Sequence, residues 1–121
     1  MFHTILIVDD SPLIRRLIRS YIDNYPEWQL CGEAANGREG IEKAVQLHPD
    51  LIVMDLSMPV MNGIQAAIAL KRLMPTIPVI IFSEYSSVFS VEEARAAGIS
   101  ALVSKAENLS VLLGKARALC Q

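Results

Sequence analysis

The sequence has few cysteines, no long apolar run and no recognisable leader. Its 121 residues include two cysteines, Cys31 and Cys120, too few for the disulfide framework of a small secreted domain. The longest apolar runs, such as residues 51–54 and 79–82, are far shorter than a membrane-spanning helix requires. The first residues also lack the basic-then-apolar order of a signal peptide. We therefore expect a cytoplasmic protein with reduced thiols and no membrane partner.

Positive charge is equally scarce. The chain carries 11 Lys and Arg residues against 13 Asp and Glu, for a formal net charge of −2, and no basic cluster is interleaved with aromatic residues. Nucleic-acid-binding domains concentrate basic residues on one face or along one helix. The composition therefore argues against nucleic-acid binding by this chain alone.

Apolar residues, in contrast, are plentiful. They make up 52% of the chain and charged residues 20%, a balance that supports a packed core and excludes a disordered chain. A length of 121 residues fits one compact domain, and neither an internal repeat nor a linker interrupts it. We expect residues 1–121 to form a single domain.

Short apolar, β-rich runs alternate along the chain with helical patterns. A continuous bulky run such as residues 5–8 is typical of a strand buried on both faces. Ser11 and Pro12 supply a helix cap and a proline at the first helical position. The strands are expected at residues 5–8, 28–34, 51–54, 79–82 and 101–103. The helices are expected at residues 12–22, 38–47 and 63–73, from the capping-box pattern of residues 90–93 to Gly98, and after Asn108.

Apolar spacing also predicts which helix faces turn toward the core. In the first helix, Arg15, Arg16 and Arg19 lie away from the apolar face. The residues expected to face inward are Leu13, Ile14, Leu17, Ile18, Tyr21, Ile22, Ile41, Ala44, Val45, Ile64, Ala67, Ile68, Leu109, Leu112, Leu113 and Ala116.

Strict alternation of strands and helices predicts an α/β fold with a parallel sheet and helices on both faces. The second and fifth strand patterns are the weakest, which suits edge positions. The expected architecture is therefore a flavodoxin-like, doubly wound sheet of five parallel strands in the order 2-1-3-4-5. In that order the first and third strands are neighbours, and the topological switch point lies at their carboxyl ends.

Five polar residues follow the apolar runs at this same edge of the sheet. Asp9 and Asp10 come directly after the first strand and Asp55 directly after the third, while Ser83 ends the fourth and Lys105 follows the fifth. A single aspartate after a strand is often only a helix cap or turn former, and Asp9 or Asp10 taken alone fits that explanation. It does not account for the whole set.

The five side chains together suit phosphoryl transfer. Clustered carboxylates repel one another unless a cation joins them, and oxygen ligands of this kind suit Mg²⁺. A phosphoryl acceptor needs a nucleophilic oxygen, a divalent ion and further groups for the remaining phosphoryl oxygens. Asp55 is the best placed nucleophile, and Asp9 and Asp10 the best placed metal ligands. Lys105 supplies a positive charge and Ser83 a hydroxyl donor.

Two segments of the sequence resemble the signatures of response-regulator receiver domains. One is residues 7–10, which read Ile-Val-Asp-Asp. The other is residues 55–63, an aspartate after a buried strand followed by Met-Pro and then Asn-Gly at the start of a helix. Ser83 and Lys105 follow the fourth and fifth strands in the order that this family requires. The resemblance covers the whole chain.

The resemblance implies that a sensor histidine kinase phosphorylates Asp55 in the presence of Mg²⁺, and that the domain works as a conformational switch. Asp10 and Asp55 would bind the ion directly, Asp9 through water or as a further ligand, and Ser57 through its backbone carbonyl. The chain would catalyse only its own phosphorylation and dephosphorylation, so it would not be an enzyme in the usual sense.

Lys105 would contact the phosphoryl group, and Ser83 would move to hydrogen-bond it. Receivers of this kind often pair, so the resemblance implies a homodimer on phosphorylation. It implies contact with DNA only through an output domain, which this chain does not contain.

Three positions depart from the family pattern. Leu102 stands where receivers often have a Tyr or Phe that relays the signal. Glu84 replaces a residue that is usually small, and we expect its side chain to point into solvent. Ala106 follows Lys105 in place of a proline, so that peptide bond should be trans. A residue other than proline there is common in regulators with helix-turn-helix output domains, which hints at transcription regulation. Two further positions bear on the lifetime of the phosphoryl group. Ser57 and Tyr85 stand where the family tunes the access of the attacking water.

Two alternative functions compete with a phosphorylated switch. Glu84 and Leu102 also fit a receiver-fold interaction module that no longer depends on phosphorylation. A phosphohydrolase of another fold would need two acids separated by one residue after its first strand, a spacing that residues 9–11 lack. If the carboxylates are clustered, replacing Asp10 by Ala should raise the melting temperature in the absence of Mg²⁺.

Overall fold

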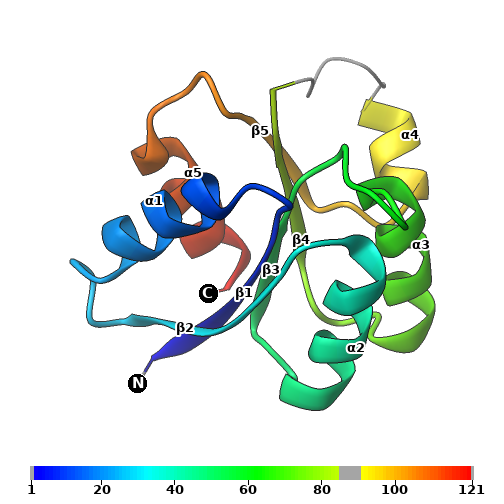
Figure 1. Ribbon diagram of the computed structural model, residues 1–121, viewed down its shortest axis with the longest axis horizontal. Helices are drawn as coiled ribbons and strands as arrows, with labels where there is room; N and C mark the ends of the chain where they lie inside the picture. The colour runs from blue at the N-terminus through cyan, green and yellow to red at the C-terminus, as the bar shows by residue number, and fades with distance from the viewer. Residues whose placement is uncertain (1, 85–90, 121) are drawn as a thin grey trace.

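The computed structural model describes residues 2–84 and 91–120 of the chain (Figure 1). Strands and helices alternate throughout, as the sequence predicts. The strands are β1 (His3–Val8), β2 (Trp28–Ala34), β3 (Leu51–Met54), β4 (Val79–Ser83) and β5 (Ala101–Ser104). The helices are α1 (Pro12–Ile22), α2 (Gly37–Leu47), α3 (Gly63–Leu73), α4 (Val91–Ala96) and α5 (Leu109–Leu119).

All strand pairs are parallel, and the order across the sheet is β2-β1-β3-β4-β5. The predicted flavodoxin-like arrangement is therefore confirmed. Helices α1 and α5 lie together on one face of the sheet, and α2, α3 and α4 cover the other (Figure 1). The central strands β1 and β3 lie side by side, with Ile5 opposite Leu51 and Val8 opposite Met54.

Each face of the sheet has its own apolar core. Alternate residues of β1 point to opposite sides: Leu6 and Val8 pack toward α2 and α3, and Ile5 and Ile7 toward α1 and α5. All four are at most 2% exposed. The continuous apolar run of residues 5–8 reflects this burial on both faces.

Side chains or glycine define several helix ends. Ser11 accepts a hydrogen bond from the Ile14 amide at the start of α1, and Asn108 accepts one from the Ser110 amide at the start of α5. Asn62 forms a capping box with Gln65 at the start of α3. After α4 the chain turns at Gly98, which has a positive φ of 83°. Of the capping-box pattern predicted before α4, Ser90 lies outside the described residues.

Four of the residues predicted to face inward are in fact largely exposed. Leu13 is 60% exposed, Leu17 50%, Val45 46% and Ile68 42%. A helix on a flat sheet buries a stripe rather than half of its surface. The helix residues that are buried against the sheet are smaller or lie nearer the middle of the buried stripe. They are Ile18, Ile22, Ala44, Ala66, Ala67 and Leu70.

The two thiols are free, as predicted, and both are partly buried. Burial raises the pKa of Cys31 and of Cys120 above the usual value for a thiol, which disfavours the thiolate, the reactive form. In the described part of the chain, no helix combines the length and apolar character needed to cross a bilayer.

Candidate functional site: an acidic cluster at the switch point

The carboxyl ends of β1 and β3 bring three aspartates together. The backbone amide of Asp9 donates to the Ala34 carbonyl of β2 (2.9 Å), and the amide of Asp55 donates to the Val8 carbonyl of β1 (2.8 Å). Because these bonds continue the sheet ladders, both side chains project from a rigid edge. Asp9, Asp10 and Asp55 each offer an oxygen, and these oxygens all lie within 4.8 Å of one another.

The three carboxylates differ in their exposure to water. Asp9 is 2% exposed and Asp55 7%, whereas Asp10 lies on the surface. Bulk water therefore solvates the carboxylate of Asp10 but not those of Asp9 and Asp55. A Mg²⁺ ion, which prefers a few carboxylates and keeps several of its waters, fits a cluster that is open on one side.

Lys105 supplies the cation between the two buried acids. Its Nζ lies 2.9 Å from Asp9 Oδ2 and 3.4 Å from Asp55 Oδ1. The Lys105 amide donates to the Ser83 carbonyl (3.0 Å), which joins the loop after β5 to the end of β4. The peptide bond from Lys105 to Ala106 is trans, as predicted.

Burial and charge shift the pKa of two of these groups. Burial, together with the neighbouring Asp9 carboxylate, raises the pKa of Asp55 above the usual value for an aspartate, although Lys105 and the Leu56 amide oppose this. For Lys105, burial favours the neutral form, but the ion pairs with Asp9 and Asp55 outweigh it and raise the pKa. Lys105 is therefore a permanent cation at neutral pH.

The loop between β3 and α3 folds closely around Asp55. The Leu56 amide donates to Asp55 Oδ1 (2.8 Å), and the Gly63 amide donates to the Leu56 carbonyl (2.8 Å). A Cβ atom at Gly63 would lie 2.3 Å from the Asp55 carbonyl oxygen, so only glycine fits there. Val60 in the same loop has a positive φ of 68°, which is uncommon for a β-branched residue.

A cavity of about 400 Å³ opens over the acidic cluster. It brings together most of the residues that the sequence singled out. Its lining includes Asp10, Asp55, Ser57, Ser83, Glu84 and Lys105. Ser83 is buried and Ser57 is exposed, and the side chain of Glu84 is exposed at the rim, as predicted.

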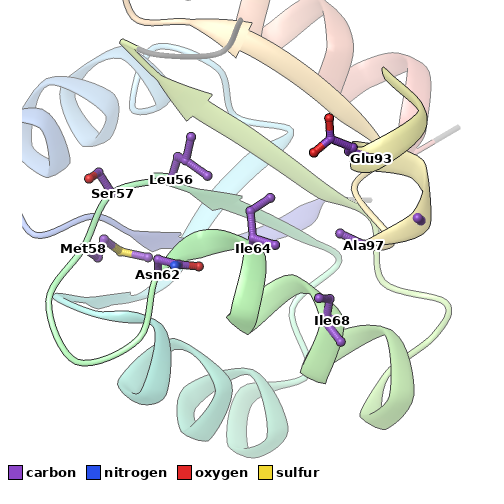
Figure 2. Close-up of a pocket in the computed structure, with 9 residues that line it drawn as sticks. Leu56, Ser57, Met58, Asn62, Ile64, Ile68, Glu93 and Ala97 are labelled. Atoms are coloured by element: carbon purple, nitrogen blue, oxygen red, sulfur yellow. The ribbon is translucent and has the colours of Figure 1, made fainter. Parts of the chain in front are cut away.

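A second, larger cavity of about 740 Å³ lies between the β3–α3 loop, α3 and α4 (Figure 2). It adjoins the acidic site, because Ser57 lines both. Its remaining lining is mostly apolar, with Glu93 as the single carboxylate among the described residues that form it. The larger hollow is therefore not where the charged groups converge.

The structure describes Leu102 but not Tyr85, the two other positions that the family pattern singles out near the site. Leu102 in β5 is half-buried and packs against the core on the α2–α4 face, so it behaves as an ordinary edge-strand leucine. Tyr85, expected to influence the access of water, lies outside the described residues.

One contact at the site was not predicted from the sequence. The helical pattern places Arg15 on the outward face of α1, yet its guanidinium donates to the backbone carbonyl of Asp9 (2.5 Å) and pairs with Glu33 of β2. No sequence signal identifies this contact, because Arg15 and Arg16 look alike in the helical pattern.

Comparison with known proteins agrees with this geometry. Residues 5–117 match the response regulator receiver domain family. The receiver of Thermotoga maritima CheB is 30% identical, with a TM-score of 0.86, and the match covers 98% of this chain and 97% of that one. Thermotoga maritima TrrA, solved in complex with Mg²⁺ and beryllium fluoride, is 26% identical with a TM-score of 0.88, over 98% and 99% of the two chains.

Among curated proteins, a protein-glutamate methylesterase/protein-glutamine glutaminase of Methanosarcina acetivorans is 41% identical over 97 residues. That match covers 80% of this chain but 28% of the relative, so this chain spans only about a quarter of the length of such proteins. The chain belongs to the response regulator receiver domain family.

Proposed function

We propose that residues 1–121 form one receiver domain in which Asp55 accepts a phosphoryl group with the help of Mg²⁺. The observation that carries this proposal is the group of three aspartate oxygens within 4.8 Å of one another, with Lys105 between the two buried members. Such a cluster has no evident structural use, because like charges at this distance oppose folding.

The two oxygens of Asp55 have different surroundings. Oδ1 accepts from the Leu56 amide and faces Lys105. Oδ2 has no hydrogen bond to any other described residue, so we assign it as the attacking atom. In the reaction, this oxygen forms a bond to phosphorus while the bond from phosphorus to the donor's nitrogen or oxygen breaks. The product is an acyl phosphate, and the leaving group takes up the proton that it needs from solvent.

The cluster fits a magnesium ion by its donor chemistry. We propose Asp10 and Asp55 as direct ligands, Asp9 as a water-mediated or additional ligand, and the backbone carbonyl of Ser57 as the remaining protein ligand. When bound, Mg²⁺ neutralises charge on the phosphoryl oxygens and on the carboxylates that surround them. The exposed position of Asp10 leaves room for the ion's waters.

Lys105 and Ser83 act on the phosphoryl group itself in this proposal. The ammonium of Lys105 already lies 3.4 Å from Asp55 Oδ1 and would pair with a phosphoryl oxygen after transfer. Ser83 lines the same cavity and would donate its hydroxyl hydrogen to another oxygen. These new contacts would pull the ends of β4 and β5 toward Asp55, which is how phosphorylation would change the surface.

Members of this family receive their phosphoryl groups from histidine kinases, and we propose such a kinase as the partner, in the cytoplasm. Homodimerisation on phosphorylation is part of the same proposal. The chain itself would turn over no substrate beyond its own acyl phosphate.

For the output, we favour control of an attached or separate effector enzyme. The support is the 41% identity to a protein-glutamate methylesterase/protein-glutamine glutaminase. Transcription regulation is the second candidate. Ala106 after Lys105 favours it, as does the likeness to a LuxR-family response regulator from Aurantimonas, which is 28% identical with a TM-score of 0.91 over 99% of this chain. DNA contact would then require an output domain outside this chain.

A phosphorylation-independent interaction module is the other reading of the same fold. Glu84 at the rim of the cavity and Leu102 in place of an aromatic residue favour it. Equal affinity for a partner with and without a phosphoryl mimic would support this reading over a switch.

Beryllium fluoride with Mg²⁺ tests the proposal directly. Fluorine NMR of the wild-type chain should show a bound signal that requires Mg²⁺, and the same signal should appear in Asp23→Asn, which changes an exposed aspartate at the end of α1. Asp55→Asn should give no bound signal. A bound signal of equal strength in Asp55→Asn would exclude Asp55 as the acceptor.

A further inference from the structure

Arg15 makes two contacts that join α1, β2 and the acidic loop. Its Nε lies 3.0 Å from Glu33 Oε1 of β2, and its Nη1 donates to the backbone carbonyl of Asp9 at 2.5 Å. The side chains of Arg15 and Glu33 are only 19% and 21% exposed. Arg19 pairs with the other oxygen of Glu33. The carboxylate of Glu33 is thus fixed from both sides, and it holds the Arg15 guanidinium in one orientation.

With this contact, every polar atom of Asp9 has a partner. Its amide donates to the Ala34 carbonyl, its Oδ1 accepts from the Ser11 amide (2.9 Å), and its Oδ2 pairs with Lys105. The carbonyl oxygen is held by Arg15 alone among side chains. Removing Arg15 would release the carbonyl directly and leave the sheet bond and the two carboxylate bonds to hold the turn by themselves.

The position of the Asp9 carbonyl also sets the orientation of the Asp10 backbone. It shares one planar peptide unit with the Asp10 amide, so a hydrogen bond to the oxygen fixes the orientation of that plane. Asp10 is exposed and has no hydrogen bond of its own to the described residues. The direction of its carboxylate toward Asp55 therefore depends on the backbone that carries it.

We infer that Arg15 is a positioning residue of the metal site: held by Glu33, it fixes the Asp9–Asp10 peptide so that both carboxylates converge on the ion. The inference rests on the proposed function, because it assumes that the ion binds this cluster. The role is geometric. A guanidinium can donate to Glu33 and to the carbonyl at once through its fixed fork, whereas the ammonium of lysine is a point donor on a flexible stem.

Calorimetric titration of Mg²⁺ into the folded chain tests whether Arg15 positions the metal ligands or only contributes stability or charge. Arg15→Met should weaken Mg²⁺ binding by about tenfold, the loss typical of residues that orient metal ligands. Arg15→Lys, which keeps the charge, should recover little of that loss. Arg16→Met is the matched control, since Arg16 is the next residue, exposed, and without an ion pair in the described part of the chain. It should bind Mg²⁺ as the wild type does.

A second readout needs no metal. The Ser11 amide, bonded to Asp9 Oδ1, should exchange its hydrogen faster in Arg15→Met than in the wild type or Arg16→Met, because the turn is no longer held at the carbonyl. If Arg15→Met does not fold, Glu33→Gln should show a smaller loss of Mg²⁺ affinity in the same direction, since it weakens the anchor of Arg15.

Wild-type Mg²⁺ affinity in folded Arg15→Met or in Glu33→Gln would overturn the inference, even if the melting temperature fell. Full recovery in Arg15→Lys would overturn the geometric role as well. A wild-type chain without Mg²⁺ affinity would instead overturn the proposed metal site, and the Ser11 exchange rates would still show whether Arg15 holds the turn.

Discussion

At the scale of single residues, two buried carboxylates of like charge share the ammonium of Lys105. Asp9 and Asp55 are 2% and 7% exposed, and Lys105 contacts both. The raised pKa of Asp55 means that its ionised form is less favourable in the folded chain than in the unfolded chain. Ionised Asp55 therefore costs stability, and the cost has a definite pH dependence.

Asp55→Asn should raise the free energy of unfolding at neutral pH without Mg²⁺, by about 0.5–2 kcal/mol, the usual range for relieving a strained functional site. Since the folded pKa lies above the unfolded one, the penalty is absent below the usual aspartate pKa of 3.8. It grows as the pH rises through the folded value. Urea titrations of both proteins across this range would measure it, and a gain that is largest at low pH would contradict the assigned sign.

The same reasoning ranks the expected effect of Asp10→Ala against that of Asp55→Asn. The repulsion that raises the pKa of Asp55 comes from Asp9, and Asp10 is exposed to water, which screens its charge. Asp10→Ala should therefore raise the melting temperature less than Asp55→Asn does. Thermal unfolding of both variants without Mg²⁺ checks this order, which would be reversed if Asp10 were the main source of repulsion.

Lys105→Met should have opposite effects on folding and on metal binding. Without metal it leaves Asp9 buried and unpaired, which should lower the free energy of unfolding by about 1–3 kcal/mol. It should also tighten Mg²⁺ binding, because the ammonium and the ion compete for Asp9 and Asp55. Urea unfolding and calorimetry measure the two effects. A weaker Mg²⁺ affinity in Lys105→Met would show that Lys105 assists the ion instead.

At the scale of elements, the loop from β3 into α3 builds the floor of the site. Gly63→Ala should destabilise the chain by about 1–3 kcal/mol, the usual cost of overpacking, because the new Cβ would collide with the Asp55 carbonyl. Gly114→Ala in α5 is the control. Nothing lies within 4 Å of its Cβ position, so it should stabilise by about 0.5–1 kcal/mol through helix propensity. Chemical denaturation measures the free energy of unfolding of both variants. Equal values would mean that the loop between β3 and α3 can move to accommodate the new methyl group.

Much of the element scale follows from the sequence because local signals agree with the fold. Apolar runs of four residues mark strands buried on both faces, and Ser11 and Asn108 mark helix starts that the structure confirms. Burial on the helices is harder to predict. Val45 and Ile68 have suitable spacing, yet the sheet covers a narrower stripe than the apolar pattern. Their exposure depends on tertiary contacts that local periodicity does not contain.

The sequence also predicts which aspartates form the site. The carboxyl ends of parallel strands lie at one edge of the sheet, so the strand order predicts that Asp9, Asp10 and Asp55 are neighbours there. The Arg15 contact with the Asp9 carbonyl depends on how α1 crosses β2, and helix spacing alone cannot distinguish it from Arg16. The close approach of Gly63 to the Asp55 carbonyl likewise depends on the path of the loop.

At the scale of the whole molecule, the sheet connects the acidic site to both of its faces. Lys105 and Ser83 join the ends of β5 and β4, and Leu102 of β5 packs on the α2–α4 face. A phosphoryl group on Asp55 would therefore act first on these two strands. Without an aromatic residue at Leu102, we propose repacking of β5 against its neighbours as the route for the signal.

The most direct measurement of the central claim is the intact mass of the chain after treatment with acetyl phosphate. We predict one added phosphoryl group on the wild-type chain when Mg²⁺ is present and none when the metal is chelated. Asp55→Asn should remain unmodified under both conditions, while Asp23→Asn should behave as the wild type does. An acyl phosphate that forms equally on Asp55→Asn, or equally without Mg²⁺, would contradict the account.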